Sequence, residues 1–203
     1  MQNASLETRY AADCEQLLGR VRCRFRRDFE VPAEVVREAI AVSGFRIVFE
    51  EMEDESDLGF CDSEERRVVI LKDFESRLHC PWVADRVLNF TLAHELGHAR
   101  LHAHLHRNGE WEAGWEEEAT LYARVFLIPR PLLMTRVETH RLLDSPRASQ
   151  ADLWDLVLEL ADFFVVSGKF MVHTLDAYGL IQFDPTTRWI AVTRNYCAVS
   201  VRT

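Results

Sequence analysis

Two patterns of hydrophobic and polar residues run along the chain, one typical of strands and one typical of helices. Residues 45–49 alternate with a period of two, which predicts a half-buried strand. Residues 58–61 and the β-branched segment 67–71 predict two further strands. These three segments can form a small antiparallel three-stranded sheet. Near the C-terminus, residues 180–183 and 189–192 predict a closing hairpin.

Apolar residues spaced three and four positions apart predict helices over most of the remaining chain. Pro32 is suited to the first turn of a helix, and Ser43-Gly44 ends that helix. Ser149 and Asp152 have the spacing of a capping box. We expect helices over residues 1–27, 32–42, 81–103, 115–128, 131–142, 149–164 and 167–178.

The length of 203 residues suits one domain, and the hydrophobic content of 48% is enough for a real core. We therefore expect a single α+β domain over residues 1–203. Its N-terminal helices would occupy residues 1–44, and the sheet with the helices of the site would occupy residues 45–130. The C-terminal helices and the hairpin would occupy residues 131–203.

The charge balance is acidic, with 33 Asp and Glu against 24 Lys and Arg and a net charge of -9. A nucleic-acid or membrane-surface function would need a basic face, so we expect neither. The arginine run that ends at Arg27 is followed at once by Asp28 and Glu30, which favours a solvated surface. The sequence contains no run of about 18 apolar residues, so we expect no membrane span. A basic protein partner is compatible with this charge.

Cysteine use indicates a reducing compartment. The chain has five cysteines, an odd number, with no C-x-x-C pair: Cys14, Cys23, Cys61, Cys80 and Cys197. Free thiols are therefore expected. The first residues lack the apolar core of a signal peptide. We expect a cytoplasmic protein.

The strongest chemical signal is His94-Glu95-Leu96-Gly97-His98, which fits H-E-x-x-H. On a helix, positions i and i+4 differ by about 40° around the axis, so both imidazoles can bind one zinc ion. Glu95 is placed to take a proton from a zinc-bound water. A pair of buried structural histidines is the alternative, but it would need many hydrogen-bonding partners. Both histidines fall in a stripe that we expect to face inward, formed by Val83, Val87, Phe90, Leu101 and Leu105.

A catalytic zinc ion needs a third protein ligand and leaves one position to water. The candidates are Glu116, Glu117, Glu118, His102, His104 and His106. We favour Glu118, because it shares a helix face with the apolar residues Tyr122 and Val125. Glu116 and Glu117 are expected to lie more to the side, in solvent.

His104 is the rival ligand, because in one large zincin class the third histidine comes ten residues after the first. That arrangement requires glycine where this chain has Leu101, so that the chain can leave the helix. In an unbroken helix His104 would lie about 1000° of rotation and some 15 Å of rise from His94. This is too far for a shared ion. We interpret His102 as a supporting residue and not as a ligand.

Two segments resemble the ImmA/IrrE family of zinc metallopeptidases: LAHELGHARLH at residues 92–102 and EATLYARVFLIP at residues 118–129. The similarity extends over about residues 45–180. It implies a zincin-like fold, in which the small sheet packs on a helical bundle that carries the motif helix. It also implies limited cleavage of a repressor with a helix-turn-helix DNA-binding domain, in stress response or mobile-element regulation.

By this resemblance His94, His98 and Glu118 match the zinc ligands, and Glu95 matches the general base. Three positions depart from the usual family pattern without removing a ligand or the base, namely Thr120, Tyr122 and Ile128. The family's longer members carry an extra sensory domain, for which this chain is too short. The trigger of activity is therefore left open.

Some assignments stay open at this stage. Tyr178, His140 and His173 are all conceivable helpers for the oxyanion, and spacing selects none of them. A non-proteolytic zincin-like scaffold, acting as a toxin–antitoxin or regulatory partner, is an alternative function. A DNA-binding helix-turn-helix over residues 153–164 and 167–177 is a weaker one, because its second helix offers few basic residues.

Overall fold

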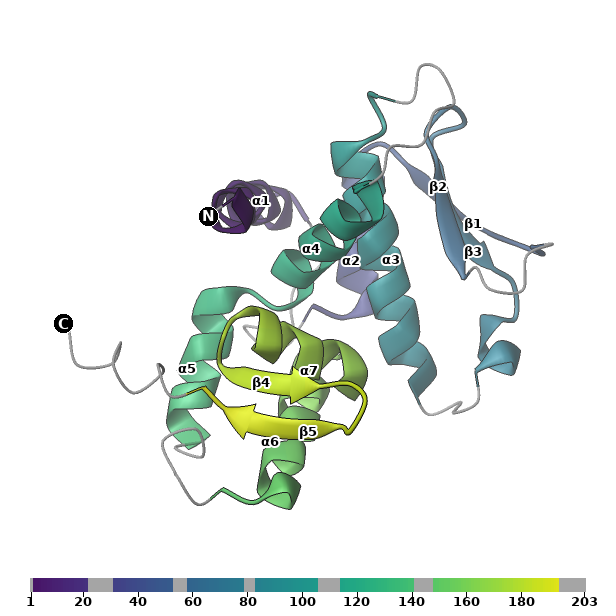
Figure 1. Ribbon diagram of the computed structural model, residues 1–203. Coiled ribbons are helices and arrows are strands. Elements are labelled where there is room, and N and C mark those ends of the chain that lie inside the picture. Colours follow the sequence, from purple (N-terminus) through teal and green to yellow (C-terminus); the bar gives the residue numbers. More distant parts are fainter. Residues whose placement is uncertain are drawn as a thin grey trace. The chain divides into compact units, whose positions relative to one another are not determined.

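The computed structural model describes residues 2–21, 31–52, 58–78, 83–105, 114–140 and 148–193. Its helices and small sheets make an α+β protein, as the sequence predicts (Figure 1). The chain divides into two compact units, Met1–Pro129 and Arg130–Thr203. The single domain expected from the length stays a prediction. Within the described chain, no helix combines the length and apolar character needed to cross a bilayer.

The first unit contains a three-stranded sheet of β1 (Arg46–Glu50), β2 (Gly59–Asp62) and β3 (Arg67–Leu71). Its order is β1-β3-β2, with β2 antiparallel to β3 but β1 parallel to β3. The predicted all-antiparallel arrangement is therefore wrong, and the sheet is mixed. A period of two indicates which side chains share a face, but it carries no information about strand order or direction.

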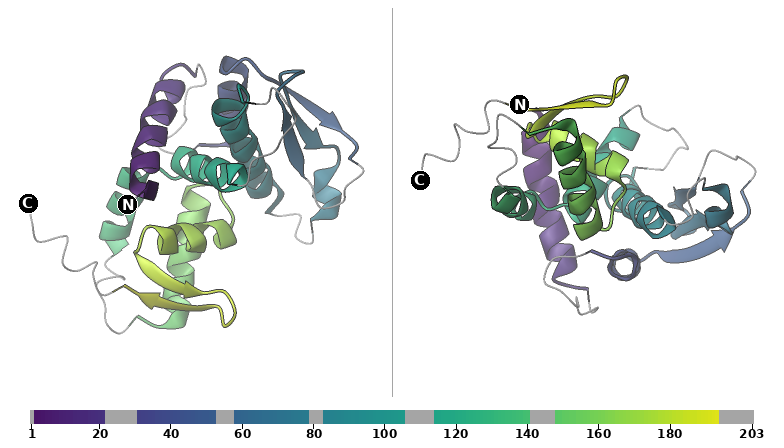
Figure 2. Two further views of the ribbon diagram at one scale, coloured as in Figure 1. Left: turned by 45° about the horizontal axis from the view of Figure 1, so that its top comes forward. Right: turned by 90° about the horizontal axis from the view of Figure 1, so that it is seen from below.

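Four α-helices accompany this sheet: α1 (Gln2–Leu18), α2 (Ala33–Val42), α3 (Ala84–Leu101) and α4 (Trp115–Leu127). The strands β2 and β3 and the helices α2 and α4 all pack against α3, while α1 packs against α4 (Figures 1 and 2). The fully buried residues of this core include Val36, Ile40, Val68, Ile70, Leu92 and Leu96. The motif helix is therefore the central element of the first unit.

Most predicted boundaries in this unit are confirmed within a few residues. Pro32 precedes the first residue of α2, and Gly44 follows the helix with a φ of 86°, which favours glycine. The first helix ends at Leu18, before the predicted end, and most of the arginine run lies outside the described residues. The expected start of α3 at Pro81 also lies outside them.

The second unit contains α5 (Arg130–His140), α6 (Gln150–Phe163), α7 (Gly168–Ala177), β4 (Ile181–Asp184) and β5 (Trp189–Val192). The predicted capping box of α6 is confirmed, because Ser149 and Asp152 exchange side-chain and backbone hydrogen bonds. The predicted hairpin is confirmed as the antiparallel pair β4–β5.

Candidate metal centre

Two glycines allow neighbouring elements to approach the motif helix closely. A Cβ atom on Gly97 would lie 3.0 Å from backbone atoms of Ala119 in α4. A Cβ atom on Gly59 would lie 3.0 Å from the side chain of Thr91, so β2 lies directly on α3. Because glycine has no Cβ atom, both α4 and the edge strand β2 can lie directly against the motif helix.

Three side chains from α3 and α4 converge at one point. Nε2 of His94 lies 3.1 Å from Nε2 of His98. One carboxylate oxygen of Glu116 lies 3.1 Å from the first nitrogen, and the other lies 3.4 Å from the second. Among the described residues, His94, His98 and Glu116 form the group of side chains that could hold a metal ion.

The chemistry of this donor set fits a zinc ion. Zinc in proteins takes imidazole nitrogen and carboxylate oxygen as ligands, and a tetrahedral site separates its ligand atoms by about 3.3 Å. The separations of 3.1 to 3.4 Å agree with that spacing. Burial lowers the pKa of His94, against the opposing charge of Glu116, so its imidazole is neutral at pH 7 and offers a lone pair. The neutral imidazole of His94, the imidazole of His98 and the carboxylate of Glu116 can thus hold a divalent metal.

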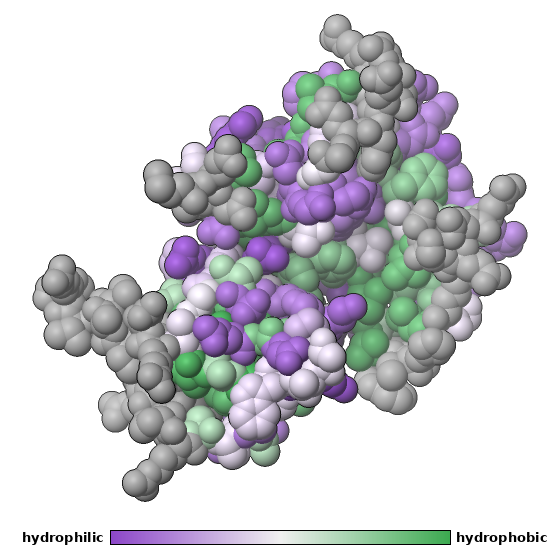
Figure 3. Space-filling model, in the orientation of Figure 1, coloured by the Kyte–Doolittle hydropathy of each residue, from purple (hydrophilic) through white to green (hydrophobic). Residues whose placement is uncertain are grey.

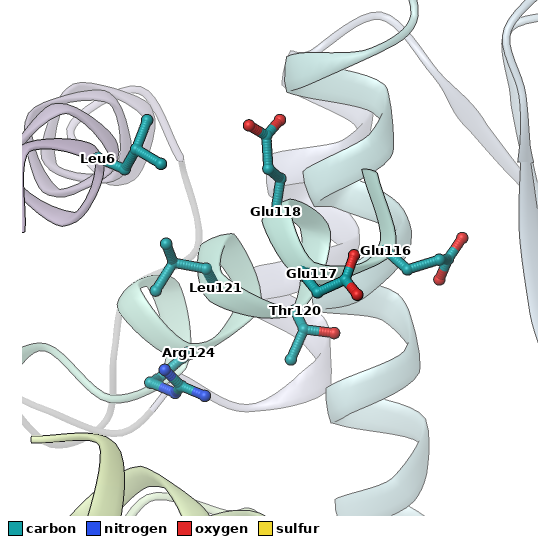
Figure 4. A pocket seen from close by; sticks show the side chains of 7 residues that line it. All are labelled: Leu6, Glu116, Glu117, Glu118, Thr120, Leu121 and Arg124. Carbon is teal, nitrogen blue, oxygen red and sulfur yellow. The ribbon is translucent and has the colours of Figure 1, made fainter. Parts of the chain in front are cut away.

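The structure does not bring Glu118 to the histidine pair. Its carboxylate lies 3.1 Å from Nε2 of His102 instead, and the side chains of Glu116 and Glu118 leave α4 in different directions (Figure 4). Glu116 is exposed, as expected, and its carboxylate is nevertheless the one that reaches His94 and His98. Glu118 as a ligand stays a prediction that this geometry does not support.

The physical reason is that α4 has two buried faces. Ala119 packs on Gly97 of α3, and Glu116 lies one turn before this contact on the same side of the helix. Tyr122 lies about 120° around the helix axis from Glu116 and faces α1, where its ring packs 5.8 Å from that of Tyr10. From the sequence we expected the face of Glu118 and Tyr122 to pack against α3. The signal that this expectation missed was the pair of small residues, Gly97 and Ala119.

Glu95 lies beside the two histidines and is 5% exposed. The pKa of the Cys61 thiol on β2 rises to about 12, chiefly through burial and next through the negative charge of Glu95. The carboxylate of Glu95 is therefore close to the edge strand. This is a suitable place for a base that acts on a water molecule between the motif and a bound peptide.

A polar cluster connects α1 to the two helices of the site. Arg100 on α3 donates two hydrogen bonds to the carboxylate of Asp13, and the Tyr122 hydroxyl donates a third at 2.6 Å. Burial alone would raise the pKa of Asp13, but these hydrogen bonds and charges outweigh it and hold the pKa below its usual value. Asp13 thus fixes α1, α3 and α4 together.

A family model of the IrrE N-terminal-like domain, Peptidase_M78, matches residues 40–176, which is more than half of the chain. The match contains the sheet, α3 and α4, and with them the three convergent side chains. The chain belongs to this family. The resemblance seen in the motifs is thereby confirmed, and the function is of the metallopeptidase type. No curated protein matches the chain.

In this member of the IrrE-like family a pocket of about 380 Å³ is lined by Glu116, one of the three donors. Leu6 of α1 lines it together with α4 residues Glu116, Glu117, Glu118, Thr120, Leu121 and Arg124 (Figure 4). Figure 3 shows hydrophilic side chains gathered over the beginning of α4. The surface beside the metal centre is therefore acidic, which favours basic or polar ligands.

The remaining candidates have other surroundings. His104 is exposed beyond the end of α3 and outside the metal-capable group, and His106 lies outside the described residues. The expected inward stripe also ends early, because α3 stops at Leu101 and Leu105 is half exposed.

The three oxyanion candidates all belong to the second unit and contact residues there. His140 pairs with Glu159 at 3.1 Å, the ring of His173 packs 5.2 Å from that of Phe183, and Arg130 lies over the Tyr178 ring. The oxyanion helper stays unassigned.

Proposed function

We propose that this IrrE-like protein is a zinc-dependent peptidase that makes limited cuts in a protein partner. One observation carries the proposal: Nε2 of His94 and Nε2 of His98 on α3 converge with the Glu116 carboxylate on α4, and Glu95 follows His94 directly on α3. When bound there, zinc supplies a Lewis acid that polarises a peptide carbonyl and makes water more acidic.

The residues of the chain then divide the remaining work. Glu95 accepts a proton from the attacking water and passes it to the leaving amine. The edge strand β2 lies against α3 beside the motif, so an extended peptide can add to the sheet and pass close to Glu95. Strand addition fixes the peptide backbone without requiring one particular side chain.

We further propose that the substrate is a DNA-binding repressor with a helix-turn-helix domain. The support is the resemblance to the ImmA/IrrE family and the charge of the enzyme. A net charge of -9 and the carboxylates around the pocket favour a basic partner. Cleavage of such a repressor would release its operator. This role belongs to stress response or mobile-element regulation.

The experiment compares new peptide termini by mass spectrometry after zinc-loaded protein has been added to a lysate of the source organism. The wild type and Glu95→Gln are run side by side. We expect a few new termini with the wild type only, among them termini within a helix-turn-helix protein. Wild-type termini confined to other proteins would refute the repressor proposal alone, whereas identical termini from both proteins would refute peptidase activity.

The same experiment tests the alternative of a non-proteolytic scaffold, and the structure disfavours the alternative of a DNA-binding module. A scaffold that binds without cutting would capture the same partner with wild type and Glu95→Gln and leave it intact. A DNA-reading role for α7 is disfavoured, because its polar residues are engaged with β4. Asp176 accepts a hydrogen bond from the Phe183 amide at 3.0 Å, and the His173 ring packs on the Phe183 ring.

A further inference from the structure

A row of close contacts leads away from the metal centre on the side opposite Glu116. Nδ1 of His98 lies 3.0 Å from Nδ1 of His102, which is four residues later at the C-terminal cap of α3. Nε2 of His102 lies 3.1 Å from a carboxylate oxygen of Glu118. His102 is 1% exposed, so this row is closed to water at its centre. Three side chains thus form a path from the metal centre to the pocket, buried at His98 and His102 and partly exposed at Glu118.

The chemistry of the imidazole ring gives this path a direction. If Nε2 of His98 binds the metal, the proton of that ring is on Nδ1, and Nδ1 is a donor. Nδ1 of His102 then has to accept, which leaves the proton of His102 on Nε2. That nitrogen in turn donates to the carboxylate of Glu118. Each donor therefore meets an acceptor, and each tautomer is determined by the next group.

The ring of His102 is also held from the side. It stacks on the indole of Trp115, the first residue of α4, with 4.8 Å between the ring centroids and an angle of 5° between the planes. Stacking of this kind restricts rotation of the imidazole ring about its side-chain bonds. In His94 the corresponding nitrogen, Nδ1, lies 3.3 Å from the hydroxyl of Thr120, so its partner is a single hydroxyl and not a second histidine.

We infer that His102 is a positioning residue, which orients His98 for the metal and is itself oriented by Glu118 and Trp115. The inference rests on the proposed function only in taking His98 as a metal ligand. It gives Glu118 a role that does not require contact with the ion. Partners of this kind fix the orientation and raise the basicity of metal-bound histidines, and their loss weakens metal binding about 10–100-fold.

Two substitutions of His102 separate its two hydrogen bonds. In His102→Asn the amide oxygen takes the place of Nδ1, so it can still accept from His98 but cannot reach Glu118. In His102→Gln the amide takes the place of Nε2, so it can reach Glu118 but not His98. We expect zinc affinity within about threefold of wild type for the first variant. For the second we expect a loss of about 10–100-fold.

Zinc affinity is measured by competition with a chromophoric chelator, and the melting temperature of each metal-free variant serves as the control for folding. Glu117→Ala is the matched control for Glu118→Ala, because it removes an exposed carboxylate one residue away that has no part in the row. Only Glu118→Ala removes the acceptor for Nε2 of His102, so only this variant should alter the zinc affinity. Equal affinities for wild type, His102→Asn and His102→Gln would overturn the inference.

A spectroscopic measurement reads the tautomers directly. Long-range ¹H–¹⁵N correlation spectra of the zinc-loaded protein, labelled at histidine, should show the proton of His98 on Nδ1 and that of His102 on Nε2. A proton on Nδ1 of His102 would overturn the inference. A wild type that binds no zinc would instead refute the proposed function, and zinc binding without peptidase activity would leave the positioning role intact.

Discussion

A carboxylate oxygen of Glu116 lies 3.1 Å from Nε2 of His94, although the two residues belong to different helices and are 22 positions apart. This contact requires α4 to start beside the middle of α3. The small residues Gly97 and Ala119 permit that approach. The candidate metal centre therefore depends on the packing of α4 against α3, and the motif helix alone does not form it.

Substitution of the two glutamates should separate the ligand from the supporting residue. We expect Glu116→Ala to weaken zinc binding by more than about 100-fold, because the loss of a ligand exceeds the loss of an outer partner. Glu118→Ala should weaken it by about 10-fold, through His102. His104→Ala should leave it nearly unchanged. Zinc content by mass spectrometry and affinity by chelator competition measure these effects.

These glutamate variants can also contradict the assignment of Glu116 as the ligand. If Glu118→Ala abolishes zinc binding while Glu116→Ala retains it, Glu118 is the third ligand, as the family resemblance implies. Glu117→Ala serves as the control for a general effect of removing a negative charge from the first turn of α4.

The sequence predicted those features that depend on local chemistry. The helix of His94 and His98, the capping box at Ser149 and the C-terminal hairpin follow from residue types at fixed spacings, and all are confirmed. The direction of β1 depends instead on how distant segments assemble, which a period of two does not encode. This is why the class of fold was predictable and the topology of the sheet was not.

The choice between Glu116 and Glu118 as the third ligand is limited in the same way within a single helix. An apolar stripe through Tyr122 indicates that this face of α4 is buried, and it is. The stripe does not say which helix covers the face, and here α1 does so through Tyr10. A ligand on a second helix therefore depends on a packing partner that a single amphipathic pattern leaves undetermined.

Gly97→Ala should destabilise the protein although alanine is the better helix former. Alanine would gain about 1 kcal/mol of helix propensity, but its Cβ would overlap the backbone of Ala119, at a cost of about 1–3 kcal/mol. Zinc affinity should fall with stability, because α4 carries Glu116. Urea unfolding and zinc competition measure both effects.

Gly168→Ala is the matched control for this substitution. A Cβ atom there would meet a terminal carbon of Leu158 at 3.1 Å, and that side chain is half exposed and can move. No loss of stability or zinc affinity is expected. An increase in stability for Gly97→Ala would contradict the close packing of α3 on α4.

Asp13→Asn should destabilise the protein in a pH-dependent way. The pKa of Asp13 lies below its unfolded value of about 3.9, so its stabilising effect is complete above that pH and is lost as the pH falls through the folded pKa. At pH 7 we expect Asp13→Asn to lose about 2 kcal/mol of unfolding free energy. The difference from wild type should shrink in acid. Urea titrations of metal-free protein across pH test this, and a pH-independent difference would contradict it.

The described thiols should be poorly reactive in the folded protein. Burial raises the pKa of both Cys14 and Cys61 to about 12, so few thiolates exist at pH 8. Alkylation should be at least about 100-fold slower than in unfolded protein. Peptide-resolved mass spectrometry follows each cysteine separately. Glu95→Gln should increase the reactivity of Cys61 but not of Cys14, and an unchanged Cys61 would place Glu95 away from β2.

The role of Glu95 can be isolated by a nearly isosteric substitution. Glutamine preserves the shape of the side chain but cannot accept a proton from water. Zinc content and melting temperature should therefore match those of the wild type. These two properties are controls, and the chemical step is the quantity that should change.

The most direct measurement is the rate at which zinc-loaded wild type and zinc-loaded Glu95→Gln cleave one peptide that spans a site found in the lysate experiment. We predict equal zinc content and a cleavage rate at least about 100-fold lower for Glu95→Gln. Equal rates for the two proteins, with one zinc ion bound to each, would contradict the assignment of Glu95 as the base of a zinc peptidase.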